Sequence, residues 1–310
     1  MLQNKIDRRQ FIQLAAGGSL ALALPGMGHA QQTMMTRTIP ATGEHIPVVG
    51  LGTSDEFERI PAEGTAQLKA VLSTLLDTGG TLVDTAPAYG NAESVLGRLF
   101  GELNRHDRFF MSTKISLRGT AAKQAGVDQM IESEKLLGKS PLDLILVHNL
   151  NDLDTQWQNL VDWKAAGRAR YIGITISQYG QFNRFEAFVR KTSGIDFVQL
   201  NYSMLEPRAG EVLIPLAVDK GAAVMVNRPF GNGGYFGRVS GKELPDWAGD
   251  FDCESWAQFS LKWILANENV TCVIPATSNP RHMLDNARAG YGRLPDPAQR
   301  RRISEFMQSF

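Results

Sequence analysis

Cysteine is scarce in this chain, and charge of one sign is concentrated nowhere in it. The 310 residues include two cysteines, Cys253 and Cys272, which do not form a CxxC pair. That excludes a zinc site or disulfide scaffold built on closely spaced cysteines, and we expect two buried free thiols. The 32 basic and 32 acidic side chains balance. Outside the N-terminus no basic cluster with interleaved aromatics occurs, so no nucleic-acid partner is expected.

A long hydrophobic run is also missing. The weakly apolar stretch that follows Arg8-Arg9 has about 17 residues and contains glycines, whereas a membrane-spanning helix needs about 20. Together with the small residues Gly28-His29-Ala30, this stretch resembles a twin-arginine export signal with its cleavage site. We predict a signal peptide over 1–30 and a mature domain over 31–310. An uncleaved membrane anchor and a disordered tail are the alternatives.

The predicted signal has consequences for the rest of the chain. The twin-arginine route carries proteins that have already folded, often around a cofactor, so it implies a loaded enzyme that is delivered to the periplasm. The export machinery is then a partner of the precursor. No stable membrane insertion is expected after cleavage.

From Thr36 onward, short runs rich in β-branched residues alternate with amphipathic stretches, and no Pro/Gly/Ser-rich linker interrupts them. This alternation predicts βαβ units and a parallel sheet within one domain. The expected strands are 48–52, 81–85, 109–115, 142–148, 171–176, 196–201, 223–228 and 270–275. The expected helices lie near 63–78, 92–103, 121–138, 155–166, 179–193, 208–220, 253–267 and 280–289.

Eight such α/β units favour a closed (β/α)8 TIM barrel. Most strand runs are continuously apolar, as expected for strands covered on both faces. An open doubly wound sheet is the alternative, but Gly50-Leu51-Gly52 lacks the third glycine of its dinucleotide fingerprint. We also expect a short N-terminal β-hairpin from 38–40 and 46–48, and a Pro- and Gly-rich loop over the site at 229–250.

Four ionisable residues fall where neighbouring predicted strands end, and a TIM barrel places its reactive groups there. The second strand ends near Asp84 with Tyr89 five residues later, the third ends near Lys114 and the fourth near His148. The Lys114 ammonium is expected to favour a tyrosine phenolate and bring a pKa of about 10 closer to the working range. Asp84 would hold the lysine, and His148 would hydrogen-bond a substrate oxygen. The set fits proton donation to a carbonyl oxygen.

Taken singly, each of these residues has an ordinary structural explanation. Asp84 suits a helix cap, Lys114 a solvated surface lysine, His148 a hydrogen-bonded core histidine, and Tyr89 a packing residue. Their joint placement at consecutive strand ends is what favours catalysis.

The chain resembles the aldo-keto reductases in several motifs. Residues 80–93, GTLVDTAPAYGNAE, are similar to the family segment that carries the catalytic Asp and Tyr. Lys114 and His148 are similar to the next two catalytic positions. Further similar motifs extend the resemblance over 38–290: Gly50-Leu51-Gly52-Thr53, Gln199 in VQLNY, and Ile274-Pro275-Ala276-Thr277 followed by Asp285-Asn286.

The resemblance implies reversible hydride transfer between NADP(H), or less often NAD(H), and an aldehyde, ketone or alcohol, without a metal. Tyr89 is then the general acid, Lys114 and Asp84 tune it, and His148 orients the carbonyl. Because the βα loops set pocket specificity, Ser54 and Asn149 are the candidate substrate-binding residues, with Phe57 and the 229–250 loop as further pocket candidates. The implied cofactor-binding residues are Gly52, Thr53, Thr175, Ser177, Gln199, Asn227, Arg228, Phe230, Thr277, Arg281, Asp285 and Asn286.

At the nicotinamide end the chain departs from the family pattern twice. Thr175-Ile176 replaces the Ser-Asn pair that usually holds the carboxamide, with Ser177 as a substitute. Asn227 stands where an aromatic ring often stacks on the nicotinamide, with Phe230 as a substitute.

At the adenosine end, the Lys or Arg residues that commonly clamp a 2′-phosphate are absent. Their positions hold Ala276, Ser278 and His282. Arg281 and Arg288 are the available replacements, because a guanidinium matches phosphate geometry. Arg281 is equally compatible with a solvated position at a helix start. NADP(H) is therefore favoured by the resemblance, and NAD(H) stays open.

Two other functions remain compatible with these motifs. One is a cofactor-binding barrel that acts as a redox sensor or partner-binding subunit. The presence of all four candidate catalytic residues argues against this function. The other is an enzyme that recycles a tightly held cofactor, since free nicotinamide cofactors are scarce outside the cytoplasm. The pattern specifies neither the substrate nor the oligomeric state.

Overall fold

Eight parallel strands form the centre of the protein, each hydrogen-bonded to the next in chain order. The computed structural model describes residues 33–59, 64–117, 119 and 122–310, so the predicted export signal lies outside the described residues. The strands are β3 (Leu51–Gly52), β4 (Leu82–Asp84), β5 (Phe110–Ile115), β6 (Leu142–Val147), β7 (Ala169–Thr175), β8 (Phe197–Asn201), β9 (Ala223–Asn227) and β10 (Cys272–Val273). All eight predicted strands are present.

The last strand returns to the first and closes the sheet. Gly50 N–H donates to the Val273 carbonyl at 2.9 Å, and Val273 N–H donates to the Val48 carbonyl at 2.9 Å. The predicted barrel is thus confirmed. Strands β3 and β10 are shorter than predicted because this seam is paired through isolated bridges, Val49 with Val273 and Gly52 with Ala276.

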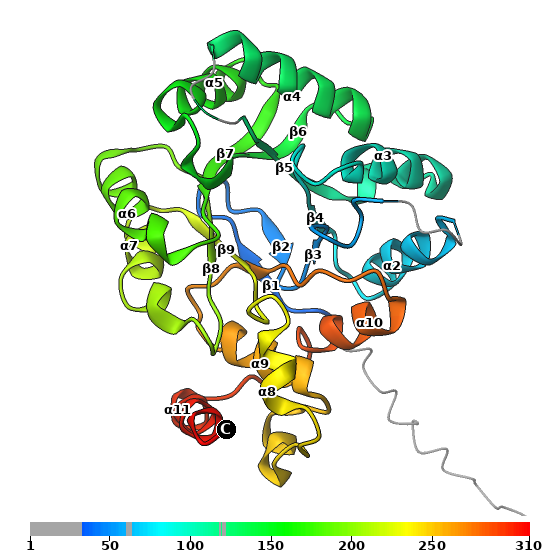
Figure 1. Ribbon diagram of the computed structural model, residues 1–310, viewed down its shortest axis with the longest axis vertical. Coiled ribbons are helices and arrows are strands. Elements are labelled where there is room, and N and C mark those ends of the chain that lie inside the picture. The colour runs from blue at the N-terminus through cyan, green and yellow to red at the C-terminus, as the bar shows by residue number, and fades with distance from the viewer. Residues whose placement is uncertain (1–32, 60–63, 118, 120–121) are drawn as a thin grey trace, which may run out of the picture. The chain divides into compact units, whose positions relative to one another are not determined.

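Helices surround the strands, one after almost every strand (Figure 1). They pack through apolar residues at helical spacing, such as Leu68, Val71, Leu72 and Leu75 on the first of them. The helices near the predicted positions are α2 (Ala66–Asp77), α3 (Ala92–Leu103), α4 (Lys123–Leu137), α5 (Leu153–Ala165), α6 (Phe182–Lys191), α7 (Leu213–Asp219), α9 (Trp256–Leu265) and α10 (Pro280–Arg288).

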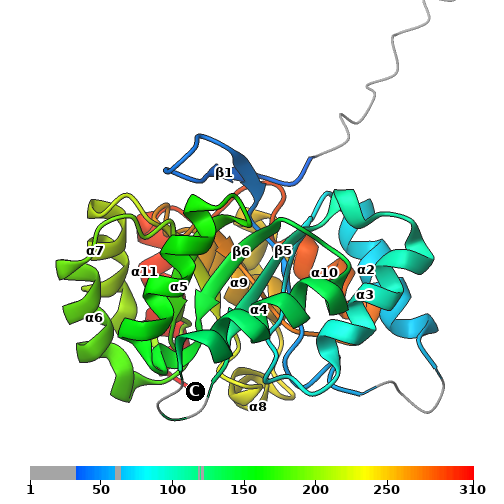
Figure 2. The same ribbon diagram turned by 90° about the horizontal axis from the view of Figure 1, so that it is seen from above.

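A two-stranded hairpin covers the amino end of the barrel (Figure 2). Strands β1 (Thr36–Thr38) and β2 (His45–Pro47) pair antiparallel, which confirms the predicted hairpin within two residues. Its Ile39 and Ile46 are buried in the same apolar cluster as Phe110, Tyr171 and Phe197 from inside the barrel. This end is therefore filled by side chains, and the site lies at the other end.

Two parts of the chain differ from prediction. The stretch 229–250, expected to be a loop, contains α8 (Gly234–Val239), because Tyr235 and Val239 are four residues apart and both are buried. An additional helix, α11 (Pro297–Gln308), was not predicted at all. Asp296 caps it, with Pro297 in its first turn and Gln299 completing a capping box.

Within the described residues, no helix is both long and apolar enough to span a bilayer.

Candidate active site

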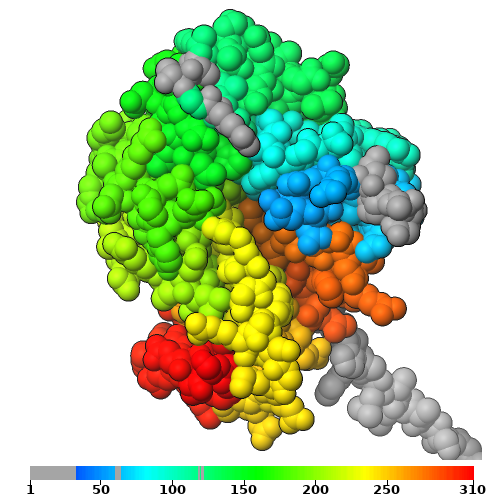
Figure 3. Space-filling model, in the orientation of Figure 1, coloured from blue at the N-terminus to red at the C-terminus, as the bar shows by residue number. Residues whose placement is uncertain are grey.

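The carboxyl ends of the strands open into a cavity of about 960 Å³. The loops after β3, β9 and β10 surround it, and Figure 3 shows them as blue, yellow and orange surfaces that meet around a hollow. Most of the predicted site residues line it: Gly52, Thr53, Ser54, Asp84, Tyr89, His148, Asn149, Thr175, Ser177, Gln199, Asn227, Arg228, Phe230, Thr277, Asp285 and Asn286. Lys114, Arg281 and Phe57 are not among the lining residues.

A buried ion pair lies at the floor of this cavity. Lys114 Nζ on β5 donates to Asp84 Oδ2 at the end of β4 over 2.7 Å, and to the Thr85 carbonyl over 2.7 Å. Ser112 Oγ donates to the other carboxylate oxygen of Asp84 at 2.7 Å. Burial lowers the pKa of Lys114, but the charge of Asp84 and the nearby Tyr89 outweigh it and leave that pKa raised. Lys114 is thus an ammonium at neutral pH.

Tyr89 lies directly above this lysine. Lys114 Nζ is 5.0 Å from the centre of the Tyr89 ring. Burial raises the pKa of Tyr89, and the Lys114 charge opposes this shift without reversing it. The expected net shift toward the working range is therefore wrong, because burial has the larger effect. Tyr89 is a protonated phenol at neutral pH, which suits a proton donor.

His148 completes the group from the end of β6. Its ring meets the Tyr89 ring edge-on, with centroids 5.8 Å apart. Its Nδ1 is 2.5 Å from Ser116 Oγ. Burial and the Lys114 charge lower the pKa of His148 to about 3, so the imidazole is neutral above that pH. If the Ser116 hydroxyl donates to Nδ1, the proton of the neutral ring is on Nε2.

Amide side chains line the wall made by β8 and β9. Thr175 Oγ1 donates to Gln199 Oε1 at 2.7 Å, and Asn227 Nδ2 donates to the Ile176 carbonyl at 2.9 Å. Gln199 Nε2 and Asn227 Oδ1 are buried and have no hydrogen-bond partner. A buried polar atom without a partner costs roughly 1–3 kcal/mol. This wall thus offers one free donor and one free acceptor.

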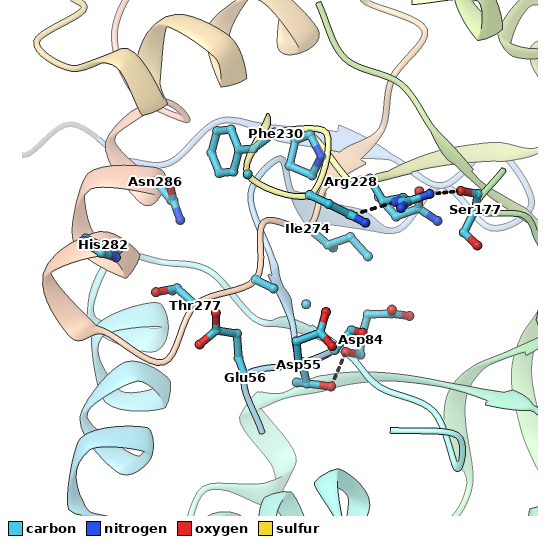
Figure 4. Close-up of a pocket in the computed structure, with 18 of the residues that line it drawn as sticks. Asp55, Glu56, Asp84, Ser177, Arg228, Phe230, Ile274, Thr277, His282 and Asn286 are labelled. Atoms are coloured by element: carbon cyan, nitrogen blue, oxygen red, sulfur yellow. Dashed lines mark hydrogen bonds between the residues drawn. The ribbon is translucent and has the colours of Figure 1, made fainter. Parts of the chain in front are cut away.

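Ser177 and Arg228 link the loops after β7 and β9. The Arg228 guanidinium donates to the Ser177 carbonyl and to Asn232 Oδ1, the latter at 2.7 Å (Figure 4). Ser177 Oγ donates to Asn149 Oδ1 at 3.0 Å. Arg228 is held with φ of 51°, a conformation uncommon for a non-glycine residue. The Arg228 guanidinium is therefore held toward the loop after β7.

The other end of the cavity is made by α10 and the start of α9. Asp285 accepts hydrogen bonds from Ser255 Oγ at 2.7 Å and from Gln258 Nε2 at 2.6 Å. Thr277, His282 and Asn286 also line this end (Figure 4). Arg281, the predicted phosphate-binding residue, is exposed and outside the lining.

The Aldo/keto reductase family model matches residues 48–305. The chain belongs to this family. Its members are NAD(P)H-dependent oxidoreductases. It is 24% identical over 248 residues to an aldo-keto reductase of Mycolicibacterium smegmatis, covering 78% of this chain and 80% of that protein. It is 27% identical over 196 residues to aldo-keto reductase YhdN of Bacillus subtilis, covering 59% of this chain and 58% of that protein, less than two thirds of its length.

Solved aldo-keto reductases share the fold of this family member. The structure of the Klebsiella pneumoniae enzyme in complex with NADPH has a TM-score of 0.73 and 23% identity, covering 88% of this chain and 96% of that one. A Klebsiella pneumoniae structure with NADP and acetate has a TM-score of 0.71 and 23% identity, covering 86% of this chain and 93% of that one. At these identities the likeness shows the fold.

Several lining residues of this aldo-keto reductase were not predicted from the sequence. They include Asp55, Glu56 and Trp256, and His282 was noted only as a position that lacks the family's phosphate-binding Lys or Arg. Phe236 lies within the 229–250 stretch that was predicted to contribute to the pocket. Asp55 and Glu56 directly follow the predicted Gly52–Ser54 stretch, which could have signalled them. Trp256 carries no such signal, because the start of α9 brings it to the cavity. Phe57, predicted to line the pocket, is instead fully buried in the core.

Both cysteines are buried free thiols, as predicted. Among the residues the structure describes, no three His, Cys, Asp or Glu side chains form a group able to hold a metal ion.

Proposed function

We propose that this aldo-keto reductase reduces an aldehyde or ketone to an alcohol, with Tyr89 as the general acid. The observation that carries the proposal is the buried Lys114, held by Asp84 at 2.7 Å and placed 5.0 Å from the Tyr89 ring. Such a charge has little structural use, but it stabilises the phenolate that remains once Tyr89 has donated its proton. Ser54 and Asn149 are the proposed substrate-facing residues on the cavity wall.

The chain's own residues supply the proton side of the reaction. The substrate oxygen accepts a hydrogen bond from His148 Nε2 and from the Tyr89 hydroxyl, which orients the carbonyl. The Tyr89 O–H bond then breaks as a new O–H bond forms on the substrate, and Lys114 stabilises the resulting phenolate. Solvent returns the proton to Tyr89 afterwards. A bound reduced nicotinamide supplies the hydride that reduces the carbonyl carbon.

The cavity wall fits a nicotinamide cofactor. The carboxamide of a nicotinamide has one acceptor oxygen and one donor nitrogen, which match the unpartnered Gln199 Nε2 and Asn227 Oδ1. Thr175, Ser177 and Phe230 line the same cavity. NADP(H) is the cofactor present in the similar Klebsiella pneumoniae structures. Gly52, Thr53, Arg228, Thr277, Asp285 and Asn286 are the further proposed contacts.

The test is Tyr89→Phe, which removes only the acidic hydroxyl. We expect kcat to fall by roughly 10²–10⁴ on a panel of aldehydes, ketones and quinones. The dissociation constant for the cofactor, measured by calorimetry, should change by less than about twofold, because the ring is kept. Tyr179→Phe removes the same atom from an exposed tyrosine and serves as the matched control.

Each outcome of this test has a distinct meaning. Unchanged turnover in Tyr89→Phe would overturn the role of Tyr89. Cofactor binding by the wild-type chain without turnover of any substrate would instead support a redox-sensing or partner-binding subunit.

We also propose that residues 1–30 act as a twin-arginine export signal and that the mature enzyme works in the periplasm. The support is the Arg8-Arg9 pair followed by a weakly apolar run and a small-residue cleavage site.

A further inference from the structure

We propose that the adenosine end of this cavity rejects a 2′-phosphate, so that the chain binds NAD(H) in preference to NADP(H). The inference rests on the proposed function, because it assumes a dinucleotide with its nicotinamide at Tyr89. It runs against the cofactor that family resemblance favours. Three observations carry it: where the far end of the cavity lies, which cations reach it, and which anions line it.

The position of the adenosine ribose follows from the shape of the cavity. The hydride must be delivered beside Tyr89 and His148, so the nicotinamide lies at the ends of β4 to β8. The cavity continues from there past β10 to Thr277 and the face of α10 (Figure 4). A dinucleotide extended along it therefore brings its adenosine ribose to α10.

No lysine or arginine lines the α10 end of the cavity in the part of the chain that the structure describes. The residues there include Ala276 and Thr277, which carry no charge, and His282. Arg281 is exposed and does not line the cavity, and its backbone N–H donates to Asn279 Oδ1 at 2.9 Å. Arg288 is outside the lining too and pairs with Glu254 at 3.3 Å.

Arg228 is the one arginine among the described lining residues, and it is held elsewhere. Its guanidinium donates to the Ser177 carbonyl and to Asn232, on the side of β7. Figure 4 shows Arg228 beside Ser177, with His282 and Asn286 at the opposite side of the cavity. Reaching α10 would require Arg228 to break both hydrogen bonds. It is therefore suited to the middle of a dinucleotide and not to its adenosine ribose.

The charges at this end are negative. Ser255 and Gln258 hold the carboxylate of Asp285 in place through hydrogen bonds of 2.7 and 2.6 Å. Glu56 adds a carboxylate on the wall across from Phe230 (Figure 4). A phosphate monoester brings nearly two negative charges at neutral pH. In doubly wound dinucleotide folds an acidic residue likewise favours the ribose hydroxyl, whereas an arginine accommodates the phosphate.

The test compares NADH and NADPH binding to the full chain by isothermal titration calorimetry at low salt. We expect NADH to bind at least about tenfold more tightly, and the difference to shrink as salt screens the carboxylates. The variant that combines Ala276→Lys with His282→Arg should improve NADPH affinity about tenfold or more and leave NADH affinity within about twofold. Leu284→Arg adds a positive charge on the exposed side of α10 and is the matched control. It should change neither affinity by more than about twofold.

The outcomes separate this inference from the proposed function. Equal or tighter binding of NADPH by the wild-type chain overturns the inference and leaves the proposed function standing. A selective loss of NADPH affinity in Arg281→Ala also overturns it, because Arg281 would then reach the phosphate. If neither dinucleotide binds, the proposed function falls and the inference with it.

Discussion

Lys114 and Asp84 are the residues whose burial most needs an explanation. Removing both charges from water costs several kcal/mol per ion, and well-packed apolar side chains of similar volume would often be as stable. The chain offsets this cost with three short hydrogen bonds, from Lys114 to Asp84 and Thr85 and from Ser112 to Asp84. Stability alone does not explain such an arrangement. The proposed role of Tyr89 does explain it, because a general acid that donates its proton leaves a phenolate that a fixed ammonium stabilises.

His148 should make the stability of the protein depend on pH. Its folded pKa is about 3, against 6.5 for an ordinary histidine. Below pH 6.5 the unfolded chain binds a proton that the folded chain does not. The free energy of unfolding therefore decreases as the pH is lowered from about 6.5 to about 3. We expect urea unfolding between pH 7 and pH 5 to show a smaller loss of stability for His148→Gln than for the wild-type chain.

The control for this prediction is His45→Gln, which removes an exposed imidazole from β2. Equal loss of stability for wild-type and His148→Gln would show that His148 is not the buried neutral histidine described above.

At the scale of elements, the strands of the barrel were predicted best, and the helices α8 and α11, which are additional to the eight α/β units, were predicted worst. Buried parallel strands appear as apolar runs in any sequence, so β4 to β9 lie within a few residues of their predicted positions. Helix α11 was missed although Ile303 and Met307 are four residues apart and buried. The α8 turn was missed because glycine-rich sequence favours a loop. Both elements depend on long-range packing, as between Phe306 of α11 and Trp247, and between Tyr235 of α8 and Trp256.

The packing of α3 on α4 depends on a single glycine. A Cβ at Gly97 would lie 1.9 Å from the Leu136 carbonyl oxygen, whereas at Gly101 of the same helix the nearest atom is 3.8 Å away. Gly97→Ala should therefore destabilise the protein by about 1–3 kcal/mol or more, since the two helices must separate. Gly101→Ala should stabilise it by about 0.5–1 kcal/mol, because alanine favours a helix. Urea unfolding of the two variants measures the change in the free energy of unfolding. A change of the same sign in both variants would contradict the described helix packing.

At the scale of the whole molecule, the sequence predicted the barrel and most of the lining residues. Asp84, Lys114 and His148 could be found because strand ends meet at one rim of a barrel. The pKa direction of Tyr89 could not, because it depends on how deeply the fold buries the ring. The outward position of Arg281 could not be predicted either. Successive residues of a helix point about 100° apart, so the side chain that faces the cavity depends on where the helix begins.

The proposed export signal is tested in cells. We expect the full-length chain to be found in the periplasm with a new N-terminus at Gln31, as shown by fractionation and mass spectrometry. Replacing both Arg8 and Arg9 with lysine should retain it in the cytoplasm, because the twin arginine is the part of the signal that the export machinery recognises. Lys5→Arg, which keeps the charge beside the pair, is the control. A wild-type chain that stays in the cytoplasm would overturn the proposal.

The closing contact of the barrel can form only late in the synthesis of the chain. Val49 bridges to Val273, a residue that is added more than two hundred positions later. At about 5–20 residues per second, roughly 10–45 s pass between the synthesis of Val49 and that of Val273. Until then a growing sheet has two open edges, one at its first strand and one at its newest strand. Closure is thus a late event in the life of each molecule, and a step that requires the finished barrel can begin only after synthesis is nearly done.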